Sequence, residues 1–445
     1  MNNIEKMSFD AIVVGTGPGG GTVARELAKR KKKILILEWG PGDPIRGNFR
    51  QYLREQLIPG KSFLITNKFL GMVRGITTGG SSMFYYATAF PVPFGMLKSY
   101  GVDIKREVAE AKKELPVGPL NDEMITPMTR RIMESAQDLG YDWQKLDKFM
   151  YQERWRPEFK FGYYGDPHGV KWSSRMFVEE AVEKGAVLLN GAKVGKVIIE
   201  NGIATGVEFR MKGRDYRAFA SKIIIAAGGI GSPVILRASG IKEAGYDFFF
   251  DPLISACGTV KDVKKQINEI PMSTGLLMQD EGYMMTDMAV PAIIDAVFTA
   301  QVFRFHRLFT MNSTLRIMIK AKDTLGGRIT DSGGVRKKLI EEDREKLMKG
   351  YRRAQEILKK AGARDIYKTW YLAAHPGGTV KIGEIVDANL KTQFDNLYVC
   401  DCSVMPEAWG LPPTLTLVGL GKYLARHLAG EKKKSVERKK KTVRQ

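Results

Sequence analysis

The sequence predicts an α/β protein with a doubly wound, nucleotide-binding domain and a second, separate domain. Three observations lead to this prediction: a βαβ unit with a glycine-rich turn at the N-terminus, a late apolar strand that opens into another glycine-rich turn, and a change of pattern after residue 250. The length of 445 residues leaves room for two or three compact units.

The βαβ unit begins with the apolar run Phe9–Val14 and continues through the turn Gly15–Gly21 into a helical pattern at Thr22–Lys32. A second apolar strand, Lys33–Leu37, ends at Glu38. Strand, glycine turn, helix and terminal acid agree with one another, so we expect this unit to bind a dinucleotide.

Each position in the turn has a physical role in that interpretation. Gly15 permits the tight turn, Gly17 lets the backbone approach a pyrophosphate, and Gly20 lets the helix and strand pack closely. The helix N-terminus supplies amide donors and a partial positive charge. Glu38 is positioned to accept hydrogen bonds from the ribose hydroxyls of the adenosine half.

Further along, Arg74–Ser82 forms a second glycine cluster, which is typical either of a plain turn or of close approach to a ligand. Segment Gly191–Val207 predicts two strands around the hairpin dipeptide Asn201-Gly202. The strand Lys222–Ala227 then opens into a glycine turn and a helix. The Met-rich stretch from Asp251 predicts a separate domain, and Val335–Ala361 predicts a long amphipathic helix.

Composition and charge narrow the class of protein. Hydrophobic residues make up 44% and charged residues 27%, which is typical of a globular chain. No apolar run approaches the ~18 residues that cross a bilayer, and no signal peptide is evident, so we expect a cytoplasmic protein. The three cysteines, Cys257, Cys400 and Cys402, indicate buried thiols, and we expect no disulfide framework and no metal site.

The formal net charge is +21, and residues 431–445 carry eight basic and two acidic side chains, +6 of that total. This tail can solubilise the chain, or it can contact an anionic membrane peripherally. The sequence contains no nucleic-acid recognition motif, so we expect no specific nucleic-acid binding.

The C-terminal third contains His375 in an HPGG context and, further on, the strand Leu397–Val399, a loop with Asp401 and a helix that starts near Pro413. With these segments the chain resembles the glucose-methanol-choline (GMC) family of FAD-dependent oxidoreductases. Five motifs match in the family's order, namely GTGPGGG with Glu38, RGITTGGSS, IIIAAGGIGSPVILRASGI, the His375 segment, and LYVCDCSVMP followed by PPTLT.

The resemblance implies an FAD-binding, Rossmann-like domain and a second α+β substrate domain built on an antiparallel sheet. The match is poorest across Asp251–Phe309. We expect residues 1–250 to be mainly FAD-binding, with insertions at about 91–180, and residues 251–330 to form the substrate-domain core. Residues 331–370 are expected to form a helical segment and its return. Residues 371–430 are expected to complete the FAD and active sites, and residues 431–445 to be the basic tail.

The resemblance also implies where FAD lies. Its ADP half is expected on the first glycine turn, with Val194 near the adenine, and its flavin end near the second glycine cluster. The C-terminal loop and helix start are expected to hold the ribityl and pyrimidine parts. The implied cofactor residues are Gly15, Gly17, Gly20, Glu38, Arg74, Gly79, Gly80, Ser82, Val194, Ala227, Gly228, Asp401 and Thr414.

The family moves a hydride from a carbinol carbon to flavin N5 while a histidine takes the hydroxyl proton, and His375 matches that histidine. An imidazole with its ordinary pKa of ~6.5 suits this role. Two departures stand out. Pro412 occupies the family's second catalytic position, usually histidine or asparagine, and Met83-Phe84 with Tyr85 and Tyr86 follow GGSS. A bulky, apolar alcohol therefore fits better than a sugar or choline.

Three functions remain open from the sequence. The first is an FAD-dependent alcohol dehydrogenase with an acceptor other than NAD, such as a quinone or a protein carrier. The second is a flavin-dependent reductase that delivers hydride to an isoprenoid-like substrate. The third is a non-catalytic flavoprotein that docks to a membrane through Lys432–Arg444.

Overall fold

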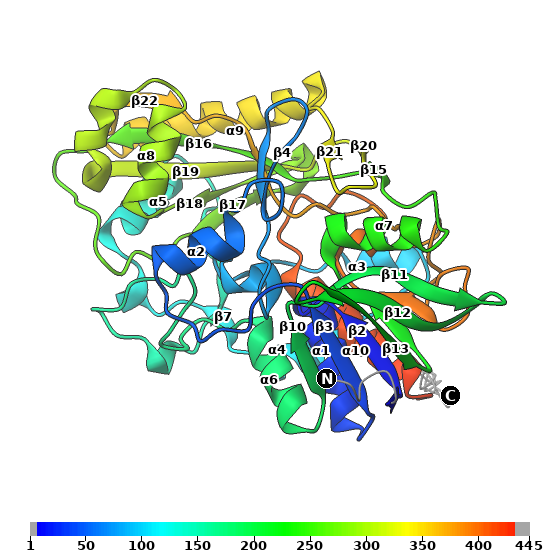
Figure 1. The fold of residues 1–445 in the computed structure, drawn as a ribbon. Helices are drawn as coiled ribbons and strands as arrows, with labels where there is room; N and C mark the ends of the chain where they lie inside the picture. Colours follow the sequence, from blue (N-terminus) through cyan, green and yellow to red (C-terminus); the bar gives the residue numbers. More distant parts are fainter. Residues whose placement is uncertain (1–6, 432–445) are drawn as a thin grey trace, which may run out of the picture.

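The computed structural model describes residues 7–431, so the predicted basic tail lies outside the described residues from Lys432 onward. Two parts lie side by side (Figure 1), a parallel-sheet part with the N-terminal βαβ unit and a part built on a larger sheet under helix α9. Within residues 7–431, no helix combines the length and apolar composition that crossing a bilayer requires.

The predicted βαβ unit lies in a five-stranded parallel sheet with the order β10-β3-β2-β14-β24. Four of these strands are buried along their whole length, as expected for a parallel sheet covered on both faces. The doubly wound fold is therefore confirmed. The strands are β2 (Ala11–Val14), β3 (Ile34–Glu38), β10 (Val187–Asn190), β14 (Ile223–Ile225) and β24 (Leu397–Val399).

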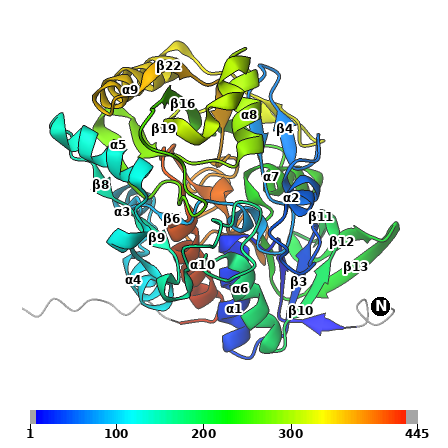
Figure 2. The same ribbon diagram turned by 90° about the vertical axis from the view of Figure 1, so that its left-hand side faces the viewer.

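Helices α1, α6, α10 and α4 pack together beside this sheet (Figure 2). Helix α1 begins at Pro18, four residues before the predicted Thr22, because proline is well tolerated in the first turn of a helix. The helices of the structure are α1 (Pro18–Lys29), α2 (Phe49–Gln56), α3 (Phe94–Ser99), α4 (Lys105–Glu114), α5 (Pro127–Asp138), α6 (Ser174–Glu183), α7 (Gly228–Ala238), α8 (Ala292–Ala300), α9 (Glu341–Lys360) and α10 (Thr414–Leu428).

The second part is a nine-stranded, mostly antiparallel sheet whose outer face packs against α9 and α5. The N-terminal and C-terminal regions both contribute strands to it, and the predicted domain boundaries stay a prediction. Its strands are β4 (Phe63–Ile65), β5 (Gly71–Val73), β23 (Leu372–Ala373), β16 (Pro252–Thr259), β19 (Thr314–Ala321), β18 (Tyr283–Asp287), β17 (Thr274–Met278), β8 (Gln144–Lys145) and β22 (Arg364–Lys368).

The predicted hairpin around Asn201-Gly202 is present as β11 and β12. The helix expected at Val335–Ala361 is shorter, because Val335–Arg336 forms strand β21 and the Asp343 carboxylate caps the start of α9. The remaining strands are β1 (Ser8–Phe9), β6 (Thr88–Ala89), β7 (Val117–Pro119), β9 (Asp147–Phe149), β11 (Lys193–Glu200), β12 (Ile203–Met211), β13 (Arg214–Ala220), β15 (Tyr246–Phe248), β20 (Gly326–Ile329) and β21.

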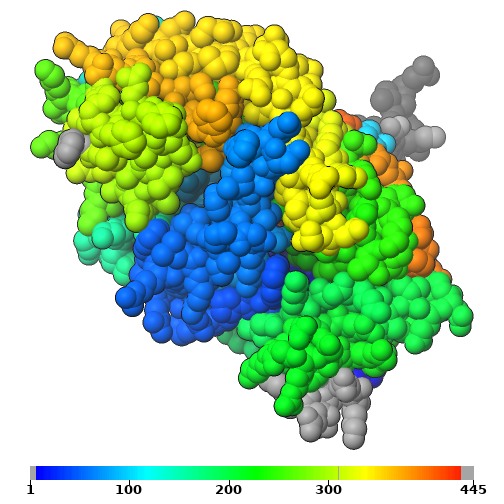
Figure 3. All heavy atoms as spheres, turned by 45° about the horizontal axis from the view of Figure 1, so that its top comes forward, coloured from blue at the N-terminus to red at the C-terminus, as the bar shows by residue number. Residues whose placement is uncertain are grey.

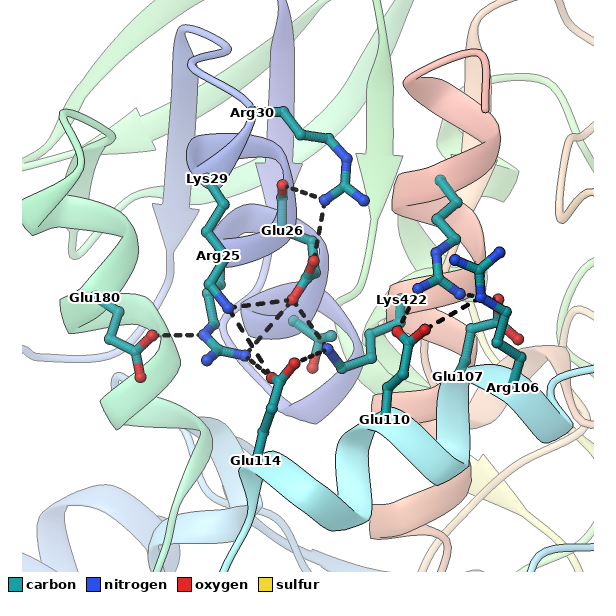
Figure 4. A network of polar contacts seen from close by, with 12 residues as sticks. Arg25, Glu26, Lys29, Arg30, Arg106, Glu107, Glu110, Glu114, Glu180 and Lys422 are labelled. Carbon is teal, nitrogen blue, oxygen red and sulfur yellow. Dashed lines mark hydrogen bonds and ion pairs between the residues drawn. The ribbon is translucent and has the colours of Figure 1, made fainter. Parts of the chain in front are cut away.

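An ion network joins the helices beside the parallel sheet (Figure 4). Lys422 on α10 lies 3.1 Å from Glu26 on α1 and 2.9 Å from Glu114 on α4. Arg25 donates to Glu114 at 2.6 Å and to Glu180 on α6 at 2.5 Å. Since Lys422 is only 3% exposed, its charge is needed to balance carboxylates that have lost much of their water.

We predict that Lys422→Met lowers the free energy of unfolding by roughly 3 kcal/mol, because it leaves partly buried carboxylates without their ammonium partner. Lys29→Met is the matched control: Lys29 lies 3.7 Å from Glu26 and 3.9 Å from Glu114, but its side chain is 33% exposed. We expect this control to cost less than about 1 kcal/mol. Urea denaturation measures both, and equal losses would contradict the role assigned to Lys422.

Candidate functional site

The first glycine turn depends on contacts that exclude a side chain. Gly15 has a φ of +102°, and a Cβ there would lie 2.2 Å from the carbonyl oxygen of Ala226. A Cβ on Gly20 would lie 2.2 Å from the carbonyl oxygen of Gly15. Only glycine fits at these two positions, so the start of α1 packs directly against the end of β14.

Gly17 is different, because its surroundings are open. A Cβ on Gly17 would meet no atom of residues 7–431 within 4 Å. Gly17 caps α1, and in the described part of the chain no side chain satisfies the amide groups of that helix start. Free amides and open space at a helix N-terminus suit a pyrophosphate, so this turn fits the phosphate bridge of FAD.

The second glycine cluster is hydrogen-bonded to the first. Thr16 Oγ1 accepts from the Gly79 amide at 3.0 Å, and a Cβ on Gly80 would lie 3.1 Å from Gly17 Cα. Ser82 Oγ donates to the Gly79 carbonyl at 2.6 Å and accepts from the Ser174 amide at 2.9 Å. The structure therefore brings the two predicted clusters together. Sequence reasoning missed Ser174, which lies in no glycine motif.

Glu38 lies at the end of β3, beside the turn. Its carboxylate accepts from the Thr16 amide at 3.2 Å, from Thr16 Oγ1 at 2.5 Å and from the Gly40 amide at 2.7 Å. Burial raises the pKa of Glu38, and these hydrogen bonds oppose the rise. These donors hold the carboxylate beside the first glycine turn, and its contact with a ribose stays a prediction.

Arg74 lies to one side of the glycine turns. It donates to the Lys61 carbonyl at 2.9 Å and lies 5.7 Å from the ring centroid of Trp39, and burial lowers its pKa to about 10. Lys61 and Lys193 each lie 4.8 Å from the same ring. The buried Val194 follows Lys193 on β11. These residues form a basic, aromatic border beside Glu38, where the adenosine half is expected.

Asp401 joins the late glycine turn to the C-terminal loop. It accepts from the Gly228 amide at 2.8 Å, from Ser232 Oγ at 2.5 Å and from the Ser403 amide at 2.8 Å. Burial raises the pKa of Asp401. Ala227 precedes this turn and caps α7, and Thr414 is the first residue of α10. Asp401 thus joins the start of α7 to the loop that follows β24, at the edge where the parallel strands end.

His375 lies on a loop just after β23 and has a left-handed backbone, with φ +48°. The loop is held by Gly378, whose amide donates to the Cys402 carbonyl at 3.1 Å. His375 Nδ1 lies 2.6 Å from Lys320 Nζ and 3.4 Å from Asp251 Oδ2, and the lysine and aspartate are 2.8 Å apart. The His375 side chain is 33% exposed, whereas those of Lys320 and Asp251 are each 1% exposed.

Sequence reasoning missed Lys320 and Asp251. Lys320 is a charged residue in a strand whose other residues are mostly apolar, and a lysine in such a strand was the signal that could have pointed to it. Burial lowers the pKa of Lys320, and Asp251 opposes this. Burial, and next the charge of Lys320, lower the pKa of His375. His375 and Lys320 therefore influence each other's charge, and the buried Asp251 carboxylate lies beside both.

The sheet face that carries Lys320 is apolar around this residue, although Arg316 lies on the same face four residues earlier in β19. Lys320 pairs across the sheet with Leu253 and Met284, which therefore share its face. A methionine-rich cluster lies there and reaches Leu411, next to Pro412. Its buried members are Phe90, Leu146, Met272, Met284, Met318 and Leu411, with Tyr86 and Leu253 packed against them.

Two buried lysines hold the segment that follows the second glycine cluster. Lys171 Nζ lies 3.1 Å from the carbonyl oxygens of Met83 and Tyr85, and Lys148 Nζ lies 2.6 Å from that of Tyr86. Burial lowers the pKa of each lysine to about 7. In the described part of the chain, no group of three His, Cys, Asp or Glu side chains is arranged to hold a metal.

Comparison with known families agrees with this architecture. The N-terminal model of the GMC oxidoreductases matches residues 9–258 and the C-terminal model matches residues 335–421. The chain therefore belongs to the GMC oxidoreductase family, and it is an FAD-dependent oxidoreductase.

Individual relatives are distant. An uncharacterized protein of Methanocaldococcus jannaschii is 26% identical over 94% of this chain and 100% of its own length. The long-chain-alcohol oxidase FAO3 of Arabidopsis thaliana is 22% identical over 95% of this chain and 68% of its own. Pyridoxine 4-oxidase from Mesorbium loti has a TM-score of 0.75 at 14% identity, covering 96% of this chain and 100% of that one. These likenesses support the fold assignment.

We predict that Gly17→Ala removes bound flavin without unfolding the protein, because the added methyl enters the open space at the start of α1. The flavin absorbance per protein should fall sharply, while the stability of flavin-free protein changes by less than about 1 kcal/mol. Gly118→Ala, at an equally open position in β7, is the control and should retain flavin. Full flavin content in Gly17→Ala would exclude this turn as the phosphate site.

Proposed function

We propose that the protein oxidises a bulky, apolar alcohol to the carbonyl compound, with His375 as the acid/base. The observation that carries this proposal is the placement of His375 beside the buried Lys320–Asp251 pair, at the border of a methionine-rich apolar face. A titrating imidazole and an apolar wall at one place suit the removal of a hydroxyl proton from an apolar substrate.

The residues around the glycine turns would hold the cofactor. The α1 start at Gly17 suits the pyrophosphate, Glu38 the ribose, and the Asp401 loop with the start of α10 the remaining polar parts. When bound, FAD supplies the acceptor for the hydride that leaves the carbinol carbon.

The proton can follow a short path through the protein. His375 Nε2 accepts the hydroxyl proton while Nδ1 passes its own proton to Lys320 Nζ, 2.6 Å away. The resulting ammonium is then stabilised by Asp251 Oδ2, 2.8 Å from Nζ. Because burial lowers the pKa of Lys320, the neutral amine that this path requires is more accessible than for an exposed lysine. Lys320 thus supplies a polar group that Pro412 cannot.

The apolar face sets the substrate class that we propose. Met284, Met318 and Leu253 lie on the strands that carry or flank Lys320, and Leu411 closes the cluster beside Pro412. Methionine and leucine offer an adaptable surface but no hydrogen bonds for sugar hydroxyls. The relation to long-chain-alcohol oxidases supports the same class.

A second candidate function is hydride delivery to a carbonyl or alkene. The contact between His375 and Lys320 favours this function when Lys320 is charged. A charged Lys320 donates to Nδ1 and leaves the proton on His375 Nε2, which then acts as a donor to an oxygen. Oxidation of an alcohol requires Lys320 neutral and His375 able to accept a proton, whereas reduction requires Lys320 charged and a proton on His375 Nε2. The oxidation rate should therefore rise with pH, whereas a reductase would lose rate as pH rises.

We predict that His375→Ala lowers the rate of flavin reduction by alcohol by about 10²–10⁴-fold, as for loss of an acid/base. His168→Ala is the control, because His168 is exposed and stacks on Phe159 away from Lys320. Anaerobic stopped-flow absorbance gives both rates. A His375→Ala rate within twofold of the unaltered protein would refute the assignment.

We predict that Lys320→Met moves the pH dependence of flavin reduction to higher pH. The charge of Lys320 lowers the pKa of His375, and its removal leaves Asp251, which raises that pKa. A base with a raised pKa reaches its active, deprotonated form only at higher pH. Since a lone buried carboxylate can impair folding, Lys320→Met/Asp251→Leu is made alongside and should lack this upward shift. An unmoved profile in folded Lys320→Met would contradict the coupling between Lys320 and His375.

A further inference from the structure

Helix α8 buries its polar side and exposes an apolar side, the reverse of an ordinary surface helix. Its polar residues Asp295 and Thr299 are buried, at 4% and 1% exposure, whereas Ile293 and Val297 are 45% and 50% exposed. Asp295 forms an ion pair with Arg316 on β19. Polar contacts thus seat the helix on the sheet, and an apolar stripe faces outward.

The chain after α8 extends this apolar surface. Phe303 is 82% exposed and Phe305 is 55% exposed. On the β4–β5 hairpin, Phe69 is 77% exposed and Ile65 is 57% exposed, and the Phe69 carbonyl accepts a hydrogen bond from the 47% exposed Trp370. Large exposed apolar groups gathered in this way mark an interaction surface.

The two protrusions lie on one face of the molecule. Figures 1 and 2 place α8 and β4 on the same side, and Figure 3 shows the blue hairpin and the yellow-green α8 region both standing out on the face in view. Phe69 and Phe303 have left-handed backbones, with φ +60° and +57°, a conformation that bulky residues rarely adopt. Glycine would adopt this backbone conformation more easily, yet both positions carry an exposed phenylalanine.

The charges around these tips are basic. Lys68, Lys261, Lys264 and Arg304 are exposed. The exposed acids beside them, Asp262 and Asp365, form ion pairs with Arg131 and Arg307. Residues 63–74 contain no acidic residue, and in 292–310 the acidic residue is the buried, paired Asp295. Outward aromatic and aliphatic groups with a basic border match the headgroup region of an anionic bilayer, which attracts lysine and arginine and accepts apolar side chains beneath.

We propose that the face formed by the β4–β5 hairpin tip and the α8–Phe305 segment docks peripherally on an anionic lipid bilayer. This surface belongs to the folded body of the protein, it is distinct from the basic tail, and it does not depend on the reaction proposed above. The contact is shallow, because the apolar groups lie on two tips rather than on a spanning helix.

Co-sedimentation with vesicles tests this proposal. The full-length flavoprotein should pellet with vesicles of phosphatidylcholine and phosphatidylglycerol at 7:3, which contain about 30% anionic lipid. It should pellet much less with vesicles of phosphatidylcholine alone. Phe303→Ser/Phe305→Ser should weaken binding on the order of 10- to 100-fold, while the bound flavin content and the thermal stability stay unchanged.

The matched control is Leu139→Ser/Val182→Ser, which removes two apolar side chains that are 43% and 42% exposed elsewhere on the surface. It should bind vesicles as the unaltered protein does. A chain that ends at Glu431 should retain the phenylalanine-dependent part of the binding. Unchanged binding in Phe303→Ser/Phe305→Ser, or complete loss on removing the tail alone, would overturn the proposal.

Sedimentation equilibrium without lipid tests whether a second copy of the chain, rather than a bilayer, binds this face. We expect Phe303→Ser/Phe305→Ser to leave the molecular mass unchanged. If that variant instead abolishes a dimer and does not alter vesicle binding, a second copy of the chain covers this face and the lipid proposal is wrong.

Discussion

The close approach of main chain to main chain at the glycine turns is the constraint on which the rest of the structure depends. Gly15 approaches the end of β14, Gly19 approaches the end of β24, and a Cβ on Gly229 would lie 1.9 Å from the carbonyl oxygen of Pro376. Segments from four regions of the chain therefore meet within contact distance at one edge of the parallel sheet. Since Pro376 follows His375, the position of the histidine depends on the same contacts that shape the turn for the pyrophosphate.

Local pattern and motif were enough to predict the nucleotide-binding half. The β-strand at Leu397–Val399 and the turn at Gly15 follow from apolar runs and glycine spacing, which are local properties. The ends of elements were less predictable, as at α9, where a carboxylate cap and a short strand replaced the expected first turns. The hairpin of β4 and β5 also joins a sheet whose other strands lie far away in sequence, and strand pairing at such separations leaves no local signal.

In the candidate site, the prediction of His375 came from its motif, but its partners could not be found in that way. Lys320 and Asp251 lie on strand β19 and just before strand β16, and their contact with His375 arises from sheet register. A buried lysine–carboxylate pair is costly to desolvate and rarely stabilises a fold as much as apolar packing would. Its presence among the apolar residues Leu253, Met284 and Met318, in contact with an accessible imidazole, is more readily explained by chemistry than by stability. Pro412 supports the same view, because it leaves the site in need of another polar group.

The most direct test of this account is an anaerobic titration of the purified flavoprotein with primary alcohols of increasing chain length and with glucose, followed by the visible absorbance of the flavin. The account predicts that long-chain alcohols bleach the flavin at concentrations where ethanol and glucose do not, because the site combines one acid/base set with an apolar face. A flavin that no alcohol reduces, or one that glucose reduces more readily than a long-chain alcohol, would contradict it.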